Sequence, residues 1–168
     1  MKRWARFFFV LYAAMMLWLL FDRSGPEPDI PYWQQIRCNM NLDPFHTIQG
    51  YWNILTNRAY YVEKWGSASV YFAHARIAVI NLIGNVIMFV PLGYFVPTVW
   101  VKCRSLLRCL LVSALMIVCV EILQLFTLLG SCDVDDLILN LVGVILGYGL
   151  CRLSHRKKHR KRRGKKRK

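Results

Sequence analysis

Long apolar runs separated by short polar segments dominate the pattern of residues along the chain. A helix rises about 1.5 Å per residue, so about 20 apolar residues cross the hydrocarbon core of a bilayer. Four runs fit such helices: Phe7 to Phe21, Ile77 to Val101, Leu106 to Leu129, and about Asp136 to Leu153. The pattern predicts an all-α, polytopic integral membrane protein with four transmembrane helices.

The first run follows a short basic segment, so a cleaved signal peptide is the alternative to a retained helix. The run ends in Leu19, Leu20 and Phe21, followed by charged residues, and no small-x-small cleavage motif comes after it. Bulky residues at this position favour an uncleaved first transmembrane helix.

The segment between the first two runs does not resemble a span. It contains ten aromatic residues between Asp22 and Arg76, mixed with Asn, Gln, Thr and Arg. Aromatic rings with polar edges partition to the headgroup layer, so residues 45–72 are predicted to form one or two helices on the outer surface. The alternative is a loop folded over the outer mouth of the bundle.

The predicted parts are residues 1–23 (N-terminal end and first span), 24–76 (outer interfacial segment), 77–153 (spans two to four) and 154–168 (basic tail).

Composition supports a membrane protein, since 56% of the residues are hydrophobic and 19% are charged. Such a chain is neither a typical soluble enzyme nor a disordered protein. The formal net charge is +14, but 12 of the 23 Lys and Arg lie between Arg152 and Lys168, which leaves 11 basic against 9 acidic residues elsewhere. The tail has no aromatic residue to stack on bases, so nucleic acid is not its expected partner. The expected partner of the tail is anionic lipid of the inner leaflet.

Basic residues also orient the spans, because Lys and Arg beside short loops are retained on the cytoplasmic side. The N-terminus, the segment between spans two and three, and the tail are basic, whereas the segment between spans three and four has three Asp and no base. We therefore predict a multi-pass protein of the cell membrane with both termini in the cytoplasm. The basic residues are Lys2, Arg3 and Arg6 at the N-terminus and Lys102, Arg104 and Arg108 between spans two and three.

The six cysteines form no CxxC pair and have no His at zinc-ligand spacing, which argues against a structural zinc site. The apolar composition argues against a disulfide framework. Cys38 and Cys132 would both lie outside the cell, so a disulfide between them is an alternative that the sequence leaves undecided.

Polar residues within the spans recur at helical spacing, so each set lies on one face of its helix. In hydrocarbon such groups usually face the bundle interior and one another. From the helical rise, Glu121 lies roughly 12 Å and Asn85 roughly 13 Å from the outer end of their spans, within the outer half of the bilayer. Three helices thus present acids and amides beneath the aromatic segment, which is a candidate binding site. The sets are Asn81 and Asn85; Glu121 and Gln124; and Asp133, Asp136 and Asn140.

Several of these residues have a structural alternative. Asn81 and Gln124 can serve interhelical packing. Asp133 and Asp135 stand just before a helix, where acids act as N-caps and complement its positive end.

The carboxylates of Glu121 and Asp136 are harder to explain by packing alone. A lone carboxylate about 12 Å deep is either protonated or meets a cation, an Arg or a polar ligand. Arg76, at the outer mouth of span two, is the nearest counter-charge, and the alternative for it is a plain interfacial anchor. The glycines in the spans are explained by helix packing alone. Gly143 and Gly147, with Gly149 nearby, are predicted to let a neighbouring helix approach closely, and Gly84 is predicted to have the same role.

Two groups of motifs resemble the VanZ-like family of bacterial membrane proteins, and the similarity covers about residues 41–148. The first blocks are Asn41-Leu42-Asp43-Pro44-Phe45 with Thr47-Ile48, then Asn81-Leu82-Ile83-Gly84-Asn85 running through Phe89, Pro91 and Gly93. The later blocks are Glu121-x-x-Gln124, then Asp133-x-Asp135-Asp136, Asn140, Gly143 and Gly147.

The family takes its name from an accessory determinant of resistance to the glycopeptide teicoplanin. The resemblance therefore implies a cell-envelope role in a Gram-positive bacterium. Many members carry an Arg shortly before the Asp cluster, where this chain has Gly130-Ser131-Cys132. The partner of the acids here would then be Arg76, a cation or a proton.

The leading hypothesis is a binding protein rather than an enzyme. A lipid or lipid-linked cell-wall component would occupy an outer-leaflet polar pocket, and this binding would contribute to glycopeptide resistance. Glu121 and Asp136 would hold a polar headgroup or a bridging cation, oriented by amides. The residues predicted to bind are Glu121, Gln124, Asp133, Asp135, Asp136, Asn140, Asn81, Asn85 and Arg76.

Two other classes stay open. The acids are hard oxygen ligands suited to Mg²⁺ or Ca²⁺, so an intramembrane metal-dependent enzyme could act on a polyprenyl-linked lipid, although no His lies in the spans and no nucleophile is evident. A small transporter or flippase is the third reading, and no inverted repeat supports it. A homodimer would provide a longer transport path, because four helices barely enclose a cavity.

Overall fold

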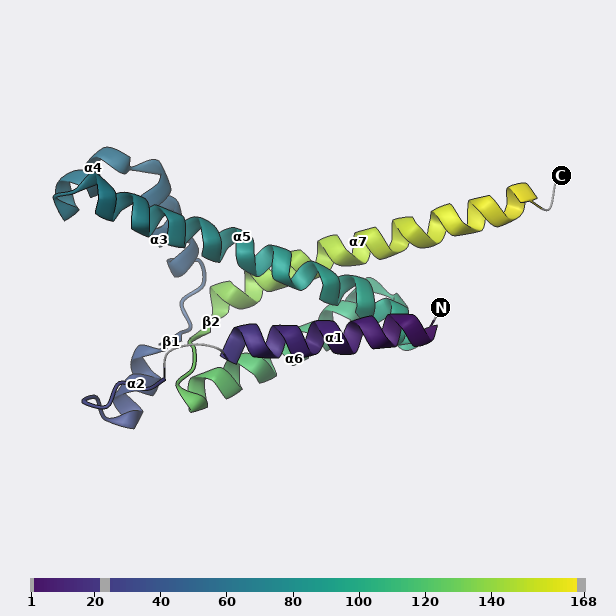
Figure 1. Ribbon diagram of the computed structural model, residues 1–168, viewed down its shortest axis with the longest axis horizontal. Coiled ribbons are helices and arrows are strands. Elements are labelled where there is room, and N and C mark those ends of the chain that lie inside the picture. The colour runs from purple at the N-terminus through teal and green to yellow at the C-terminus, as the bar shows by residue number, and fades with distance from the viewer. Residues whose placement is uncertain (1, 22–24, 166–168) are drawn as a thin grey trace.

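The computed structural model describes residues 2–21 and 25–165, with the side chains of residues 3–21 and 25–155. The described chain is almost entirely helical (Figure 1). The helices are α1 (Lys2–Phe21), α2 (Tyr32–Cys38), α3 (His46–Thr56), α4 (Arg58–Trp65), α5 (Ala68–Val99), α6 (Leu106–Thr127) and α7 (Val134–Lys165), with a 3₁₀ turn, η1 (Val101–Arg104). Two short strands, β1 (Met40–Asn41) and β2 (Cys132–Asp133), pair in parallel.

Four of the helices are long and apolar enough to cross a membrane. This confirms the predicted all-α polytopic fold. The spans are Arg3–Phe21, Ala68–Val99, Leu106–Thr127 and Val134–His155. Three elements extend beyond the predicted limits: α1 begins at Lys2 rather than Phe7, α5 begins at Ala68 rather than Ile77, and α7 continues into the basic tail as far as Lys165.

The four long helices place both ends of the chain on one side of the molecule. In Figure 1 the start of α1 and the end of α7 lie on the right, and the short helices α2, α3 and α4 lie on the left. An even number of crossings requires this arrangement. The side of the membrane on which the termini lie stays a prediction.

Serine side chains fix the starts of two spans. The hydroxyl of Ser67 accepts a hydrogen bond from the N–H of Ser69 at the start of α5, and the hydroxyl of Ser105 accepts one from Arg108 at the start of α6. An N-cap of this kind satisfies backbone donors that the first turn of a helix leaves unpaired. Ser67 therefore explains why α5 begins before the continuous apolar run.

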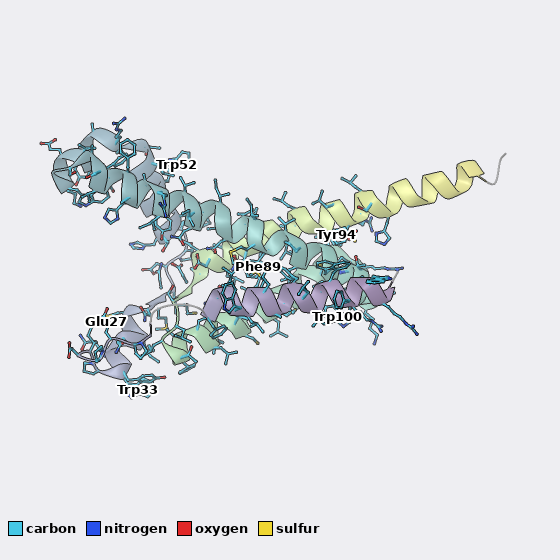
Figure 2. The ribbon with its side chains drawn as sticks, viewed as in Figure 1. Glu27, Trp33, Trp52, Phe89, Tyr94 and Trp100 are labelled. Carbon is cyan, nitrogen blue, oxygen red and sulfur yellow. The ribbon has the colours of Figure 1, made fainter. Side chains whose placement is uncertain are left out.

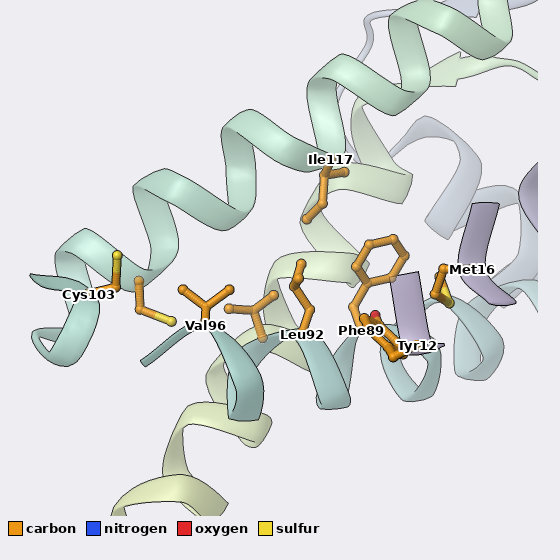
Figure 3. Packing of buried hydrophobic residues seen from close by; sticks show 9 residues of the cluster. Tyr12, Met16, Phe89, Leu92, Val96, Cys103 and Ile117 are labelled. Atoms are coloured by element: carbon orange, nitrogen blue, oxygen red, sulfur yellow. The ribbon is translucent and has the colours of Figure 1, made fainter. Parts of the chain in front are cut away.

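The main hydrophobic core lies between the long helices (Figure 3). Phe89, Leu92 and Val96 recur at three- and four-residue spacing on α5 and so share one face. The hydroxyl of Tyr12 on α1 donates a 2.8 Å hydrogen bond to the carbonyl of Met88, which ties α1 to α5. The core cluster consists of Tyr12, Met16, Phe89, Leu92, Val96, Cys103, Cys109, Ile117 and Val144.

Glycines allow α5 and α7 to approach each other closely. A Cβ atom added at Gly147 would lie 1.9 Å from the carbonyl oxygen of Val90, and one added at Gly143 would lie 2.1 Å from a carbonyl oxygen of α5. The predicted packing role of these two glycines is confirmed. The same expectation is wrong for Gly84 and Gly149, because a Cβ atom at either position would have no heavy atom within 4 Å outside its own stretch of helix.

The outer faces of the spans are apolar. On α6, Leu107, Leu111 and Leu115 recur at four-residue spacing and are 60% to 67% exposed. Such a stripe belongs in contact with lipid.

The segment between α1 and α5 divides into two arms. The helix α2 adjoins the end of α6, where the hydroxyl of Tyr32 donates to the carbonyl of Phe126 at 2.8 Å. The helices α3 and α4 pack along the first half of α5. Figure 2 shows Trp33 and Trp52 on these separate arms, and both rings are more than 60% exposed. The predicted short helices within residues 45–72 are confirmed as α3 and α4, and their position at a membrane surface stays a prediction.

Candidate functional site

An acidic cluster, consisting of Glu121, Asp133, Asp135 and Asp136, lies at the end of the bundle away from the chain termini. The parallel pairing of β1 with β2 sets Asn41 opposite Asp133 and so draws the outer segment onto the start of α7. Glu121 comes from α6, and the other acids come from β2 and the first turn of α7. The cluster is built by elements far apart in the sequence.

Asp136 joins α7 to α5. Its Oδ1 accepts a short hydrogen bond from Nδ2 of Asn85. This contact agrees with the general expectation that polar groups of the spans face one another. Asn140 lies one turn further along α7 and therefore on the same face as Asp136.

Asp133 organises the chain around it. Its Oδ2 accepts a 2.6 Å hydrogen bond from the Thr47 hydroxyl, and the Asn41 amide lies 3.3 Å from both of its carboxylate oxygens. Its Oδ1 accepts from the backbone N–H of Asp135 at 2.9 Å, as an N-cap does at the start of a helix. The expected capping role of Asp133 is therefore present.

Asp135 is completely buried and binds the start of α3. Its two carboxylate oxygens accept hydrogen bonds from the backbone N–H groups of Phe45 and Ile48, the latter at 3.0 Å. Phe45 has φ of +66°, a left-handed conformation that is uncommon for an aromatic residue. The carboxylate thus supplies the cap that α3 lacks from its own sequence, and its described contacts are structural.

Glu121 and Asn140 each hold a buried oxygen with no hydrogen-bond partner among the described residues. These atoms are Oε1 of Glu121 and Oδ1 of Asn140, and the two residues are 7% and 5% exposed. Glu121 also lies within electrostatic range of Asp136 and Asp133. Leaving a buried acceptor without a donor costs about 1 to 3 kcal/mol, and more when the acceptor is charged. These oxygens are therefore positions where a donor-bearing ligand would bind favourably.

Tyr51 of α3 stands over the cluster. Its hydroxyl lies 3.2 Å from Nδ2 of Asn81, which donates to it. Burial and the nearby carboxylates of Asp136 and Asp133 raise the pKa of the Tyr51 phenol, so the group stays a neutral donor at ordinary pH. Tyr51 was not among the predicted site residues, because nothing in the sequence distinguishes it from the other aromatic residues of the outer segment.

Cys132 of β2 borders the same cluster. Burial, with the carboxylates of Glu121 and Asp133, raises the pKa of its thiol. Cys38 and Cys132 are both free thiols in the structure, so the disulfide left open by the sequence is not formed there.

Two predicted site residues make other contacts. The Gln124 amide donates a 2.8 Å hydrogen bond to the carbonyl of Leu20 and so links α6 to the end of α1. This is the packing role weighed for it from the sequence. Arg76 is exposed on α5, and none of the described hydrogen bonds involves it.

An apolar cavity of about 400 Å³ lies between α1, α5 and α6. Its lining includes Ile117 and Val120, which lie one turn before and immediately before Glu121 on α6. Leu20, whose carbonyl binds Gln124, also lines it. The polar cluster and a cavity suited to a hydrocarbon chain are therefore adjacent on α6.

The chemistry of the cluster favours a ligand that presents hydrogen-bond donors. The described hydrogen bonds to Asp133 and Asp135 come from neutral amide, hydroxyl or backbone N–H groups, and Asp136 accepts one from the amide of Asn85. Among the described residues, no group of three or more His, Cys, Asp or Glu is arranged to hold a metal ion. Hydroxyl or ammonium groups fit this environment better than a bare phosphate, which the carboxylates would repel.

The fold and the cluster together define a polytopic α-helical membrane protein with an acidic, amide-lined site near one end of its bundle. The chain matches the VanZ/LLP1 family over residues 9–155, nearly its whole length, and it belongs to that family. The resemblance noted in the motifs is thereby confirmed, and it connects the protein at the family level to glycopeptide resistance. No curated protein and no solved structure matches the chain.

Proposed function

We propose that the protein binds a lipid or lipid-linked cell-wall component at the acidic cluster, and that this binding contributes to glycopeptide resistance. The observation that carries the proposal is the pair of buried acceptor oxygens without donors, on Glu121 and Asn140. A sugar hydroxyl or an ammonium group of a headgroup would supply those donors.

The surroundings of the two oxygens support a lipid in particular. The apolar cavity beside Ile117 and Val120 would take a hydrocarbon chain, while Glu121 on the next turn would meet the polar headgroup. In this proposal Glu121 and Asp136 bind the headgroup, and Asn85 and Asn140 orient it. Asp133 and Asp135 hold the outer segment in place over the site.

The test is teicoplanin susceptibility of a sensitive Gram-positive host that expresses the wild-type protein, Glu121→Gln or Asp136→Asn at matched membrane levels. We expect resistance from the wild type and its loss in both variants. The control is Glu63→Gln, which removes an exposed acid on α4 and should behave like the wild type. Full resistance in Glu121→Gln would contradict the proposal.

A binding assay separates this function from the two other classes. The purified protein would be incubated with a polyprenyl-linked disaccharide, and both the bound lipid and any reaction products would be measured by mass spectrometry. Retention of unchanged lipid by the wild type, reduced in Glu121→Gln, supports binding. Metal-dependent turnover of the lipid would instead make the protein an enzyme, and movement of the lipid across vesicles would make it a flippase.

A further inference from the structure

A second cavity, of about 250 Å³, lies at the opposite end of the bundle, where α5, η1 and α7 meet. Tyr94 and Trp100, labelled in Figure 2, mark this end of α5. The proposed headgroup site does not use this cavity. Its lining residues are Pro97, Arg104, Tyr148, Cys151, Arg152 and His155.

Contacts within the lining position its two arginines. The Tyr148 hydroxyl donates a 2.8 Å hydrogen bond to the backbone carbonyl of Arg104, which fastens η1 to α7. The guanidinium carbon of Arg152 lies 5.9 Å from the centre of the Tyr148 ring, within the range of a cation–π contact. Tyr148 therefore contacts the backbone of Arg104 and the guanidinium of Arg152 at the same cavity.

His155 completes the lining one turn beyond Cys151. Its Nδ1 lies 2.8 Å from the Cys151 carbonyl, which can only accept, so Nδ1 carries the hydrogen.

Charge in this region is of one sign only. The sequence contains no Asp or Glu in residues 64–120 or 137–168, so α5, η1 and the part of α7 that lines the cavity carry no acid; the two acids of α7 lie in its first turn, at the other end of the helix. Two exposed arginines without a local carboxylate attract anions, and planar guanidinium groups match phosphate oxygens in pairs. Basic pockets between transmembrane helices are a known way to hold anionic headgroups.

We propose that this cavity binds the phosphate group of an anionic phospholipid headgroup, with Arg104 and Arg152 as its ligands. Its volume is below that of most small-molecule pockets and suits a headgroup rather than a whole lipid. The acyl chains would remain in the surrounding bilayer. The basic tail adds general attraction to the same lipids, whereas the cavity selects the phosphate.

The full chain, purified in a zwitterionic detergent, would be titrated with phosphatidylglycerol, with phosphatidylcholine of the same chains, and with inorganic phosphate. Native mass spectrometry gives the bound fraction at each concentration. The test variant carries Arg104→Gln and Arg152→Gln. The charge-matched control carries Arg6→Gln and Lys102→Gln, two exposed residues that do not line the cavity.

We expect the wild type to prefer phosphatidylglycerol and the test variant to lose about 100-fold or more in affinity, because each Arg gives up charge-assisted hydrogen bonds to the phosphate that contribute about 1.5 kcal/mol or more. The control should lose no more than a few-fold. All three proteins should melt at the same temperature without lipid, because the substituted side chains are exposed.

Equal losses in the test and control variants would overturn the proposal, because they would show that total charge attracts the lipid. Equal affinity of the wild type for both lipids would also overturn it. Binding of inorganic phosphate as strong as that of phosphatidylglycerol would show that the ligand is a free anion and not a lipid.

Discussion

Asn85 on α5 donates a hydrogen bond to the Asp136 carboxylate on α7, between two helices that also meet through glycine contacts. The amide brings a neutral donor to an acid that lies beside two other carboxylates. This contact therefore does two things: it fixes the relative position of α5 and α7, and it orients a carboxylate of the candidate site.

Replacing Asn85 with Leu should lower stability, because Asp136 would lose a donor in a partly buried position. We expect a loss of about 1.5 to 3 kcal/mol, the usual contribution of a hydrogen bond to a charged group. Thermal unfolding of the purified protein in detergent, followed by circular dichroism, measures the change. Asn53→Leu, at an exposed position on α3, is the control. A melting temperature of Asn85→Leu equal to that of the control would show that the hydrogen bond contributes nothing.

The glycines on α7 allow a direct test of helix packing. A Cβ atom at Gly147 would lie 1.9 Å from the Val90 carbonyl oxygen, whereas one at Gly149 would meet nothing within 4 Å. Gly147→Ala should therefore push α5 and α7 apart and destabilise the protein by about 1 to 3 kcal/mol. Gly149→Ala should be neutral or slightly stabilising, because Ala favours helix over Gly. Melting temperatures of the two variants in one detergent check both expectations, and equal temperatures would contradict the close approach.

The four spans could be predicted from the sequence because the hydropathy of each is a local property. The boundaries of α5 could not be predicted as well. Residues between Ala68 and Arg76 mix polar, aromatic and apolar side chains, and their helical state depends on the Ser67 cap and on packing against α3 and α4. Hydropathy therefore placed the start of this helix at the apolar run.

The candidate site shows the same division. Helical spacing predicted which faces of α5, α6 and α7 would carry the polar residues, and the contact between Asn85 and Asp136 agrees with it. The spacing could not show that Asp135 would bind the start of α3, since that contact depends on β1 pairing with β2 across about 90 residues. For the same reason Tyr51 was not identified. Contacts made by the outer segment are long-range, and no local pattern encodes them.

Cys132 offers a pH-dependent readout of the acidic cluster. Burial and the carboxylates of Glu121 and Asp133 raise the pKa of its thiol, so the folded protein favours the neutral form. The contribution of this shift to stability is present below the ordinary thiol pKa, about 8.5, and is lost as the pH rises through the raised pKa. Because only the thiolate reacts with maleimide, Cys132 should be modified slowly at pH 8 and its rate should increase at higher pH than that of an ordinary thiol.

Peptide-resolved mass spectrometry measures the modification of Cys132 and of the exposed Cys38 in the same sample, so Cys38 is the internal control. We expect the Cys132 profile to lie at higher pH, and Glu121→Gln to shift it downward, because that substitution removes one of the charges that disfavour the thiolate. The Cys38 profile should move less, because Cys38 is exposed and water and salt screen the charge of Glu121 there. Coincident profiles for the two thiols in the wild type would contradict the assignment of Cys132 to the border of the acidic cluster.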